Sequence, residues 1–263
     1  MKVLAVETAT SWQSVALLDE STVLGLESQE ATGSHGTLLL PAIDRLLTNA
    51  GLTLTQLDGL VCSSGPGSFT GLRVGMATLL GMRAATGVPL VLVPTLEAMA
   101  WSLKGTAGLV CPVLPSRKDE LYWAVFRWGA GGLLERLVPE HVGPPGLLAQ
   151  TLTGTTTMFG EGWTMMEPAI RSALSPGVAI RPASGDVSRP SAVAVGLAGV
   201  ERLRRGDIAG EQVTPLYVQR TEAEIRYDQS GGVSPVARRQ ARVAGKIAAR
   251  AARRPRATGQ EPR

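Results

Sequence analysis

A strand, a glycine-rich turn and a helix in direct succession constrain the fold of this chain more than any other feature. The apolar residues 57–62 predict a strand, the turn SSGPGS follows at 63–68, and residues 69–86 have the apolar spacing of a helix. Backbone N–H groups at the start of such a helix lack intrahelical partners and attract anions. The succession therefore predicts an α/β fold with a loop shaped like a phosphate-binding loop.

The turn fits neither standard phosphate motif. Gly67 and Gly71 are separated by three residues, whereas the dinucleotide motif has two at that place. Leu72 and Arg73 follow Gly71, where a P-loop has Lys and Ser or Thr. We expect either a different kind of nucleotide loop or a loop that only shares the shape. The candidate nucleotide-loop residues are Glu7, Thr8, Gly65, Gly67, Ser68 and Gly71.

The order of the remaining elements indicates a mixed sheet covered by helices. An antiparallel meander of three strands is predicted at 2–7, 13–18 and 22–28. A helix at 35–49 follows, and then the strand 57–62 and the helix 69–86 described above. A strand at 89–93 and a helix at 96–103, with Thr95 as its N-cap, come next. A second segment begins near residue 108, with strands at 109–114, 120–128 and 133–142, a helix at 191–205 and a short strand-like run at 214–219. Residues 143–185 are rich in Gly, Pro and Thr, and their pattern assigns no element.

The two N-terminal helices are more apolar than contact with one sheet requires. Helix 69–86 has small residues on one side and large apolar residues on the other, and helix 35–49 has a wide leucine stripe. The surplus predicts either a protein interface or cover by the second lobe, and both readings stay open. The predicted partner-interface residues are His35, Leu38, Leu39, Ile43, Leu46, Leu72, Met76, Leu79, Leu80 and Arg83.

Few residues in the sequence point to catalysis. The two histidines, His35 and His141, lie far apart, and Leu39 occupies the position one turn after His35. We therefore expect no metal site and no catalytic residue. The two cysteines are expected to be small core residues. Glu7 is expected either to lie in a solvated turn, the favoured reading, or to help hold metal and phosphate.

The basic character of the chain is concentrated at its C-terminus. The sequence holds 26 Lys and Arg against 22 Asp and Glu, and nine of these bases but one acid fall in residues 236–263, so the rest carries a net charge of −4. Such a tail predicts a disordered end or a nonspecific RNA-binding arm. The early Glu7 argues against a signal peptide and no apolar run is long enough for a membrane span, so we expect a cytoplasmic protein.

Five segments of the sequence, taken together in their order, resemble the bacterial TsaB family, formerly YeaZ. These segments are VLAVETATSWQSVALLD, SHGTLLLPAIDRLLTNAGL, LDGLVCSSGPGSFTGLRVGMATLLGMRAATGVPLVLVPTLEAMA, DELYWAVF and TPLYVQRTEAE. The resemblance implies an actin/Hsp70-like, ribonuclease H-like fold of two related lobes. It divides the chain into an N-terminal lobe (1–105), a C-terminal lobe (106–227) and a basic tail (228–263).

The resemblance also implies a function. The family helps to make N6-threonylcarbamoyladenosine at position 37 of tRNAs that read A-starting codons. It implies a non-catalytic subunit that binds and activates TsaD, is joined by the ATPase TsaE, forms a homodimer when alone, and meets tRNA through the complex. No cofactor is implied, although weak ATP or ADP binding within the complex stays open.

The sequence departs from the family pattern at two places, and its residues also leave two other functions open. Pro115-Ser116-Arg117 stands where relatives have an Asp-Ala-Arg-like turn, and the tail from Asp228 exceeds the usual family end. The alternatives are an actin-like ATPase or sugar-kinase-type enzyme, motivated by Glu7, Thr8 and the glycine loop, and an M22-type peptidase homologue. The absence of a nucleophile–base pair in the sequence speaks against the peptidase.

Overall fold

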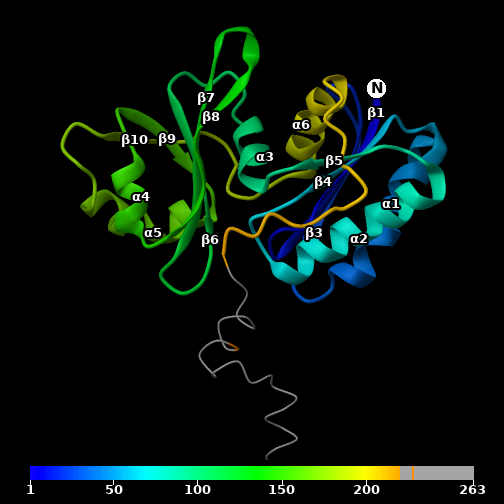
Figure 1. Cartoon of the computed structure of the whole chain (residues 1–263), viewed down its shortest axis with the longest axis horizontal. Helices are drawn as coiled ribbons and strands as arrows, with labels where there is room; N and C mark the ends of the chain where they lie inside the picture. The colour runs from blue at the N-terminus through cyan, green and yellow to red at the C-terminus, as the bar shows by residue number, and fades with distance from the viewer. Residues whose placement is uncertain (220–226, 228–263) are drawn as a thin grey trace, which may run out of the picture. The chain divides into compact units, whose positions relative to one another are not determined.

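The first half of the chain builds a five-stranded mixed sheet. The structure is a computed structural model that describes residues 1–219 and Tyr227. The predicted meander forms, and two further strands add in parallel beside β1, which gives the order β3-β2-β1-β4-β5 (Figure 1). The strands are β1 (Lys2–Glu7), β2 (Trp12–Asp19), β3 (Thr22–Glu30), β4 (Gly59–Ser63) and β5 (Leu90–Val93). The strands β1 and β4 are apolar and almost wholly buried because helices cover both faces of this sheet.

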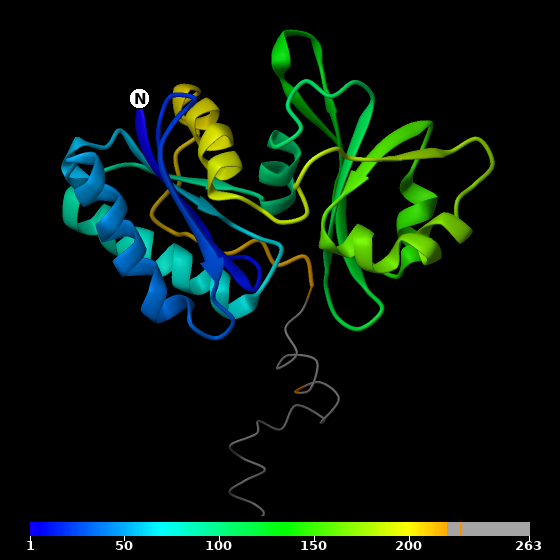
Figure 2. The same cartoon turned by 180° about the vertical axis from the view of Figure 1, so that it is seen from behind.

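The crossover helices of this sheet both lie on one of its faces. Helix α1 (His35–Ala50) precedes β4, with a short 3-10 turn η1 (Leu54–Gln56) between them, and helix α2 (Phe69–Thr86) follows β4 (Figures 1 and 2). The glycines predicted as stop signals, Gly51 and Gly87, cap these helices with φ of 64° and 75°, which the left-handed region allows glycine to adopt without strain. The predicted helix limits here are confirmed.

The second half repeats this topology. Its sheet has the order β10-β9-β6-β7-β8, which, read from β8, is again three antiparallel strands followed by two parallel ones. The strands are β6 (Leu109–Pro115), β7 (Leu121–Trp128), β8 (Leu134–Gly143), β9 (Thr155–Phe159) and β10 (Ala179–Pro182), with the 3-10 turn η2 (Ala130–Gly132) before β8 and crossover helices α4 (Pro145–Thr151) and α5 (Glu161–Ser172). The segment that the sequence left unassigned therefore contains α4, β9, α5 and β10. The two-lobe, actin/Hsp70-like fold is confirmed.

The last helix of each half packs on the sheet of the other half. Helix α3 (Thr95–Trp101) packs against β6 and β7, whereas helix α6 (Ala192–Arg204) covers the face of the first sheet opposite α1 and α2 (Figures 1 and 2). Glycine permits the close approach of α6, because a Cβ on Gly199 would lie 2.3 Å from Val61 Cγ1. The division into lobes 1–105 and 106–227 stays a prediction. Helix α6 belongs to the second of these ranges, yet it contributes to the core of the first sheet.

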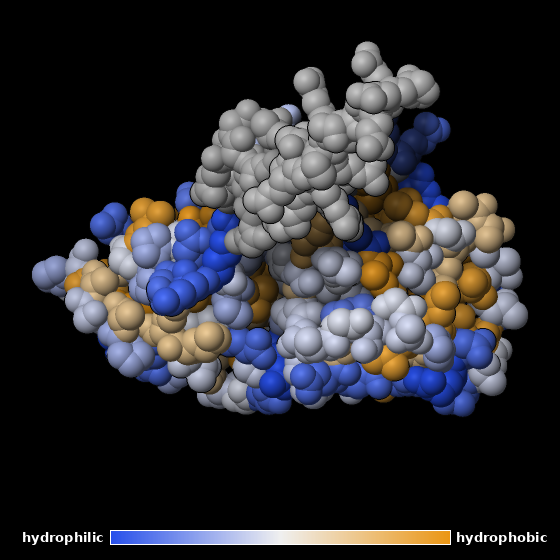
Figure 3. Space-filling model, turned by 90° about the horizontal axis from the view of Figure 1, so that it is seen from below, coloured by the Kyte–Doolittle hydropathy of each residue, from blue (hydrophilic) through white to orange (hydrophobic). Residues whose placement is uncertain are grey.

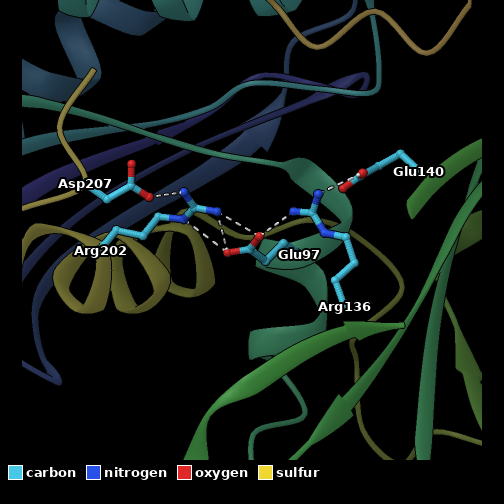
Figure 4. A network of polar contacts seen from close by, with 5 residues as sticks. All are labelled: Glu97, Arg136, Glu140, Arg202 and Asp207. Carbon is cyan, nitrogen blue, oxygen red and sulfur yellow. Dashed lines mark hydrogen bonds and ion pairs between the residues drawn. The ribbon is translucent and has the colours of Figure 1, made fainter. Parts of the chain in front are cut away.

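A network of ion pairs holds α3 between α6 and the second sheet (Figure 4). Glu97 of α3 accepts bonds from Arg202 of α6 at 2.9 Å and from Arg136 of β8 at 2.7 Å. Arg202 also pairs with Asp207, and Arg136 with Glu140. Glu97 is only 15% exposed at its side chain, so these interactions are partly shielded from water.

Three smaller expectations have different outcomes. Thr95 is the first residue of α3 and Pro94 its N-cap, so the predicted N-cap was wrong; the Thr95 hydroxyl instead accepts a bond from the Gly65 N–H. Cys62 and Cys111 are buried and unpaired, and burial raises the pKa of both thiols, which confirms them as core residues. The strand-like run expected at 214–219 forms no strand. None of the helices within the described residues is long and apolar enough to cross a membrane.

Candidate functional site

Three backbone N–H groups of the glycine loop between β4 and α2, those of Gly65, Ser68 and Gly71, are hydrogen-bonded within the chain. The Ser68 N–H donates to the Ala9 carbonyl at 2.6 Å, and the Gly71 N–H donates to Ser68 Oγ at 3.2 Å. The Gly65 N–H donates to Thr95 Oγ1 at 3.2 Å. The start of α2 therefore offers a phosphate fewer unpaired donors than the sequence pattern indicates.

The loop glycines serve close packing of neighbouring backbone. A Cβ on Gly71 would lie 2.1 Å from the Thr8 carbonyl oxygen, and one on Gly67 would lie 2.3 Å from the Ala9 carbonyl oxygen. Contacts this short do not occur, so both positions need glycine as long as the turn between β1 and β2 packs there. This turn occupies the space in front of the helix start, where an anion would have to approach.

Glu7 ends β1 beneath this turn and is buried. Its side chain is 1% exposed, so the favoured expectation of a solvated turn was wrong. Burial raises the Glu7 pKa to about 7, against the lowering effect of the hydrogen bond from the Ala9 N–H. In the described part of the chain, Glu7 Oε2 and Thr8 Oγ1 lack a hydrogen-bond partner, and no three His, Cys, Asp or Glu side chains come together as metal ligands.

Most of the predicted interface residues lie in the core of the isolated chain, which corrects the expectation that they form a surplus exposed face. Buried are His35, Leu39, Ile43, Leu46, Leu72, Met76 and Leu79. The reason is geometric: α1 and α2 lie side by side on the sheet, so their wide apolar stripes fill both the layer above the sheet and the groove between the helices. The first sheet and the helix pair itself, rather than the second sheet, cover these side chains.

A smaller apolar surface remains on the side of α1 and α2 that points away from the sheet. We call it the outward face and define it by Leu40, Phe69, Ala77, Gly81 and Ala84, which are all exposed. Leu40 is 54% exposed, and nothing lies within 4 Å of a Cβ built on Gly81. Seen from below, the side of the molecule that carries these helices shows apolar residues among weakly polar ones (Figure 3).

The remaining three predicted residues border this face and are half-buried. Leu80 packs against the core of the first sheet, and Leu38 is half-buried in the first turn of α1. Arg83 donates to the carbonyl oxygens of Ala209 and Gly210 at 2.9 and 2.8 Å, so its charge is used within the chain.

Three contacting residues at one end of the outward face did not stand out in the sequence. Phe69 and Tyr217 stack with ring centroids 5.6 Å apart, and the Arg73 guanidinium carbon lies 3.7 Å from the Phe69 centroid. Arg73 Nε donates to the Tyr217 hydroxyl at 2.9 Å. The four-residue spacing of Phe69 and Arg73 was a signal for part of this cluster, but no local pattern connects either residue with Tyr217.

Comparison with known proteins gives one consistent result. Residues 21–149 match the family model for TsaD, tRNA N6-adenosine threonylcarbamoyltransferase. The chain is similar to the tRNA threonylcarbamoyladenosine biosynthesis protein TsaB of Escherichia coli, at 30% identity over 85% of this chain and 96% of that protein. The TsaB of Bacillus subtilis matches at 27% identity over 88% and 99%. Among solved structures, YeaZ from Pseudomonas aeruginosa matches at 30% identity and a TM-score of 0.68, covering 82% of this chain and 99% of that one.

Proposed function

Since the chain belongs to the TsaB family of tRNA threonylcarbamoyladenosine biosynthesis proteins, we propose that it acts there as a non-catalytic subunit that binds and activates TsaD. The outward face of α1 and α2 is the proposed contact surface. The observation that carries the proposal is that this face stays apolar and exposed after both helices have buried their main stripes in the core.

The composition of the outward face suits a helix of a partner. Ala77, Gly81 and Ala84 have small side chains, so another backbone can approach α2 closely, while Leu40 offers a large apolar side chain at the neighbouring helix. Exposed apolar patches on soluble proteins mark interaction sites. The same face provides the contact for a homodimer when TsaD is absent, and TsaE joins the complex of the two proteins.

The site near Glu7 supports a non-catalytic role. The Gly65, Ser68 and Gly71 N–H groups are paired within the chain, and the described residues hold no metal-ligand cluster. Elsewhere in the chain, burial raises the pKa of the Cys62 and Cys111 thiols, so that neither is a reactive thiolate. These features also weigh against the actin-like ATPase and the peptidase. Weak ATP or ADP binding within the complex stays a prediction, as does the meeting with tRNA in the cytoplasm.

The experiment is co-purification with the TsaD of the same organism. The Leu40→Asp variant is compared with Leu133→Asp, because Leu133 is similarly exposed, at 50%, but lies between β7 and β8. Burying one leucine in an interface contributes about 1.5–3 kcal/mol, so Leu40→Asp should weaken TsaD binding at least about tenfold and Leu133→Asp should not. Equal binding of parent and Leu40→Asp would contradict the proposed contact surface.

A second measurement separates subunit from enzyme. The chain alone should form no threonylcarbamoyladenosine in tRNA, and TsaD with the chain should form it faster than TsaD without it. Modification by the chain alone, or ATP turnover that the Glu7→Ala variant abolishes, would refute the non-catalytic role.

A further inference from the structure

The cluster of Phe69, Arg73 and Tyr217 holds an arginine in a fixed position at the surface. The Arg73 guanidinium lies over the Phe69 ring, and its Nε is hydrogen-bonded to the Tyr217 hydroxyl. Both rings are substantially exposed, Phe69 at 40% and Tyr217 at 43%. An arginine is ordinarily one of the most mobile surface side chains, so these contacts remove conformational freedom before any ligand arrives.

Arg73 keeps its main binding groups unused. In the described part of the chain, its Nη groups form no hydrogen bond or ion pair, since its one polar contact is through Nε. Two parallel N–H groups on a planar guanidinium match the two oxygens of a carboxylate or phosphate. The cluster is therefore suited to receive an anion.

The location of Arg73 connects it with the outward face. Phe69, Arg73, Ala77 and Gly81 follow one another at intervals of four residues, which places them on one side of α2. Arg73 is exposed and lies at the end of the row of small residues. A helix that packs over Ala77 and Gly81 would bring its flanking side chains to Arg73.

The surrounding charges favour a protein carboxylate over an RNA phosphate. Binding of nucleic acid needs several cations that neutralise successive phosphates. On this side of α1 and α2, however, Arg45 is paired with Glu27 at 2.6 Å, Arg83 is bound to carbonyl oxygens, and Asp44 adds an exposed negative charge. A single arginine that forms no ion pair and lies within an apolar surface is typical of a protein interface.

We propose that Arg73 is the anion-binding residue of the outward face and takes a carboxylate of an acidic side chain of the partner protein. Tyr217 acts as a positioning residue for it. The chain segment that carries Tyr217 is itself fixed, because the Leu216 N–H donates to the Ser64 carbonyl at 2.7 Å. The C-terminal segment thereby prepares the interface although it lies far from α2 in the sequence. The inference rests on the proposed binding of TsaD.

The test is the dissociation constant for TsaD of the same organism, measured by calorimetry at low and high salt. Arg73→Ala should weaken binding roughly a hundredfold, and Arg73→Lys about tenfold because lysine keeps the charge but not the planar pair of donors. Tyr217→Phe keeps the ring and should cost about fivefold to tenfold. The control is Arg127→Lys, since Arg127 is also exposed and pairs with Glu135 on the second sheet.

Salt dependence distinguishes a direct ionic contact from a structural effect. The parent should lose affinity for TsaD as salt rises, and Arg73→Ala should show a flatter dependence. If the parent binds TsaD and the Arg73 variants bind equally well, the inference is wrong while the proposed function stands. If the parent does not bind TsaD, both fail. Loss of tRNA affinity in Arg73→Ala with unchanged TsaD affinity would assign Arg73 to RNA instead and overturn the inference.

Discussion

Replacing two glycines of the same helix by alanine should change stability in opposite directions. A Cβ on Gly71 would lie 2.1 Å from the Thr8 carbonyl oxygen, a backbone atom that cannot rotate away, whereas a Cβ on Gly81 meets nothing within 4 Å. Alanine within a helix gains about 0.5–1 kcal/mol over glycine. Gly81→Ala should therefore stabilise the chain by about that amount.

Gly71→Ala must displace the turn between β1 and β2 or the start of α2. Overpacking of this kind costs about 1–3 kcal/mol, which exceeds the helical gain, so we expect a net loss of about 1–2 kcal/mol. The two variants should differ by roughly 1.5–3 kcal/mol, or about 3–12 °C in Tm for a domain of this size.

Urea unfolding followed by circular dichroism measures both variants against the parent, with thermal scans as a second readout. Gly81→Ala is the matched control, because it makes the same chemical change in the same helix. Equal stability of the two variants would refute the reasoning that Gly71 is required by close packing.

Three further perturbations test other parts of the structure. The pKa of Glu7 is about 7 in the folded chain, against an ordinary value near 4.5. As pH rises from 4.5 to 7, the carboxyl group therefore loses its proton in the unfolded chain before it does so in the folded chain. The free energy of unfolding should fall by roughly 3 kcal/mol over this range. Glu7→Gln should remove this part of the pH dependence in urea titrations, and an unchanged profile would contradict it. Leu39→Asp and Leu79→Asp should unfold the isolated chain, because both side chains are at most 1% exposed. The control, Leu40→Asp, should change the free energy of unfolding by less than about 0.5 kcal/mol. A native circular dichroism spectrum of Leu39→Asp and Leu79→Asp would disprove the assignment of these leucines to the core. Glu97→Gln leaves Arg136 and Arg202 without their shared carboxylate and should lower the free energy of unfolding by about 1–3 kcal/mol. The loss should be smaller in 1 M salt. A loss that salt does not alter would speak against an ionic origin.

Local patterns in the sequence predicted the first sheet and its helices well. The meander, the apolar run of β4 and the glycine stops after α1 and α2 are signals within a few residues, and each corresponds to an observed element. The interval 143–185 failed because α4 and β10 are short and α5 carries an internal proline, Pro168, so no period extends far enough to be recognised.

The site was less predictable because exposure depends on tertiary packing. Leu39 and Leu40 are adjacent and identical in type, yet one is buried and the other is 54% exposed, and only the position of α2 and the sheet decides which. The contact of Arg73 with Tyr217 joins residues 144 positions apart. The tail from Asp228, expected to be disordered or to bind RNA, lies outside the described residues.

The reciprocal placement of α3 and α6 has a consequence for how the polypeptide can be divided. A backbone break in the connection between α3 and β6 would separate α3 from the second sheet and α6 from the first sheet. Each fragment would then have a sheet that lacks one covering helix, and a helix that lacks the sheet on which it packs. Neither fragment should be stable by itself, and the two produced together should reassemble.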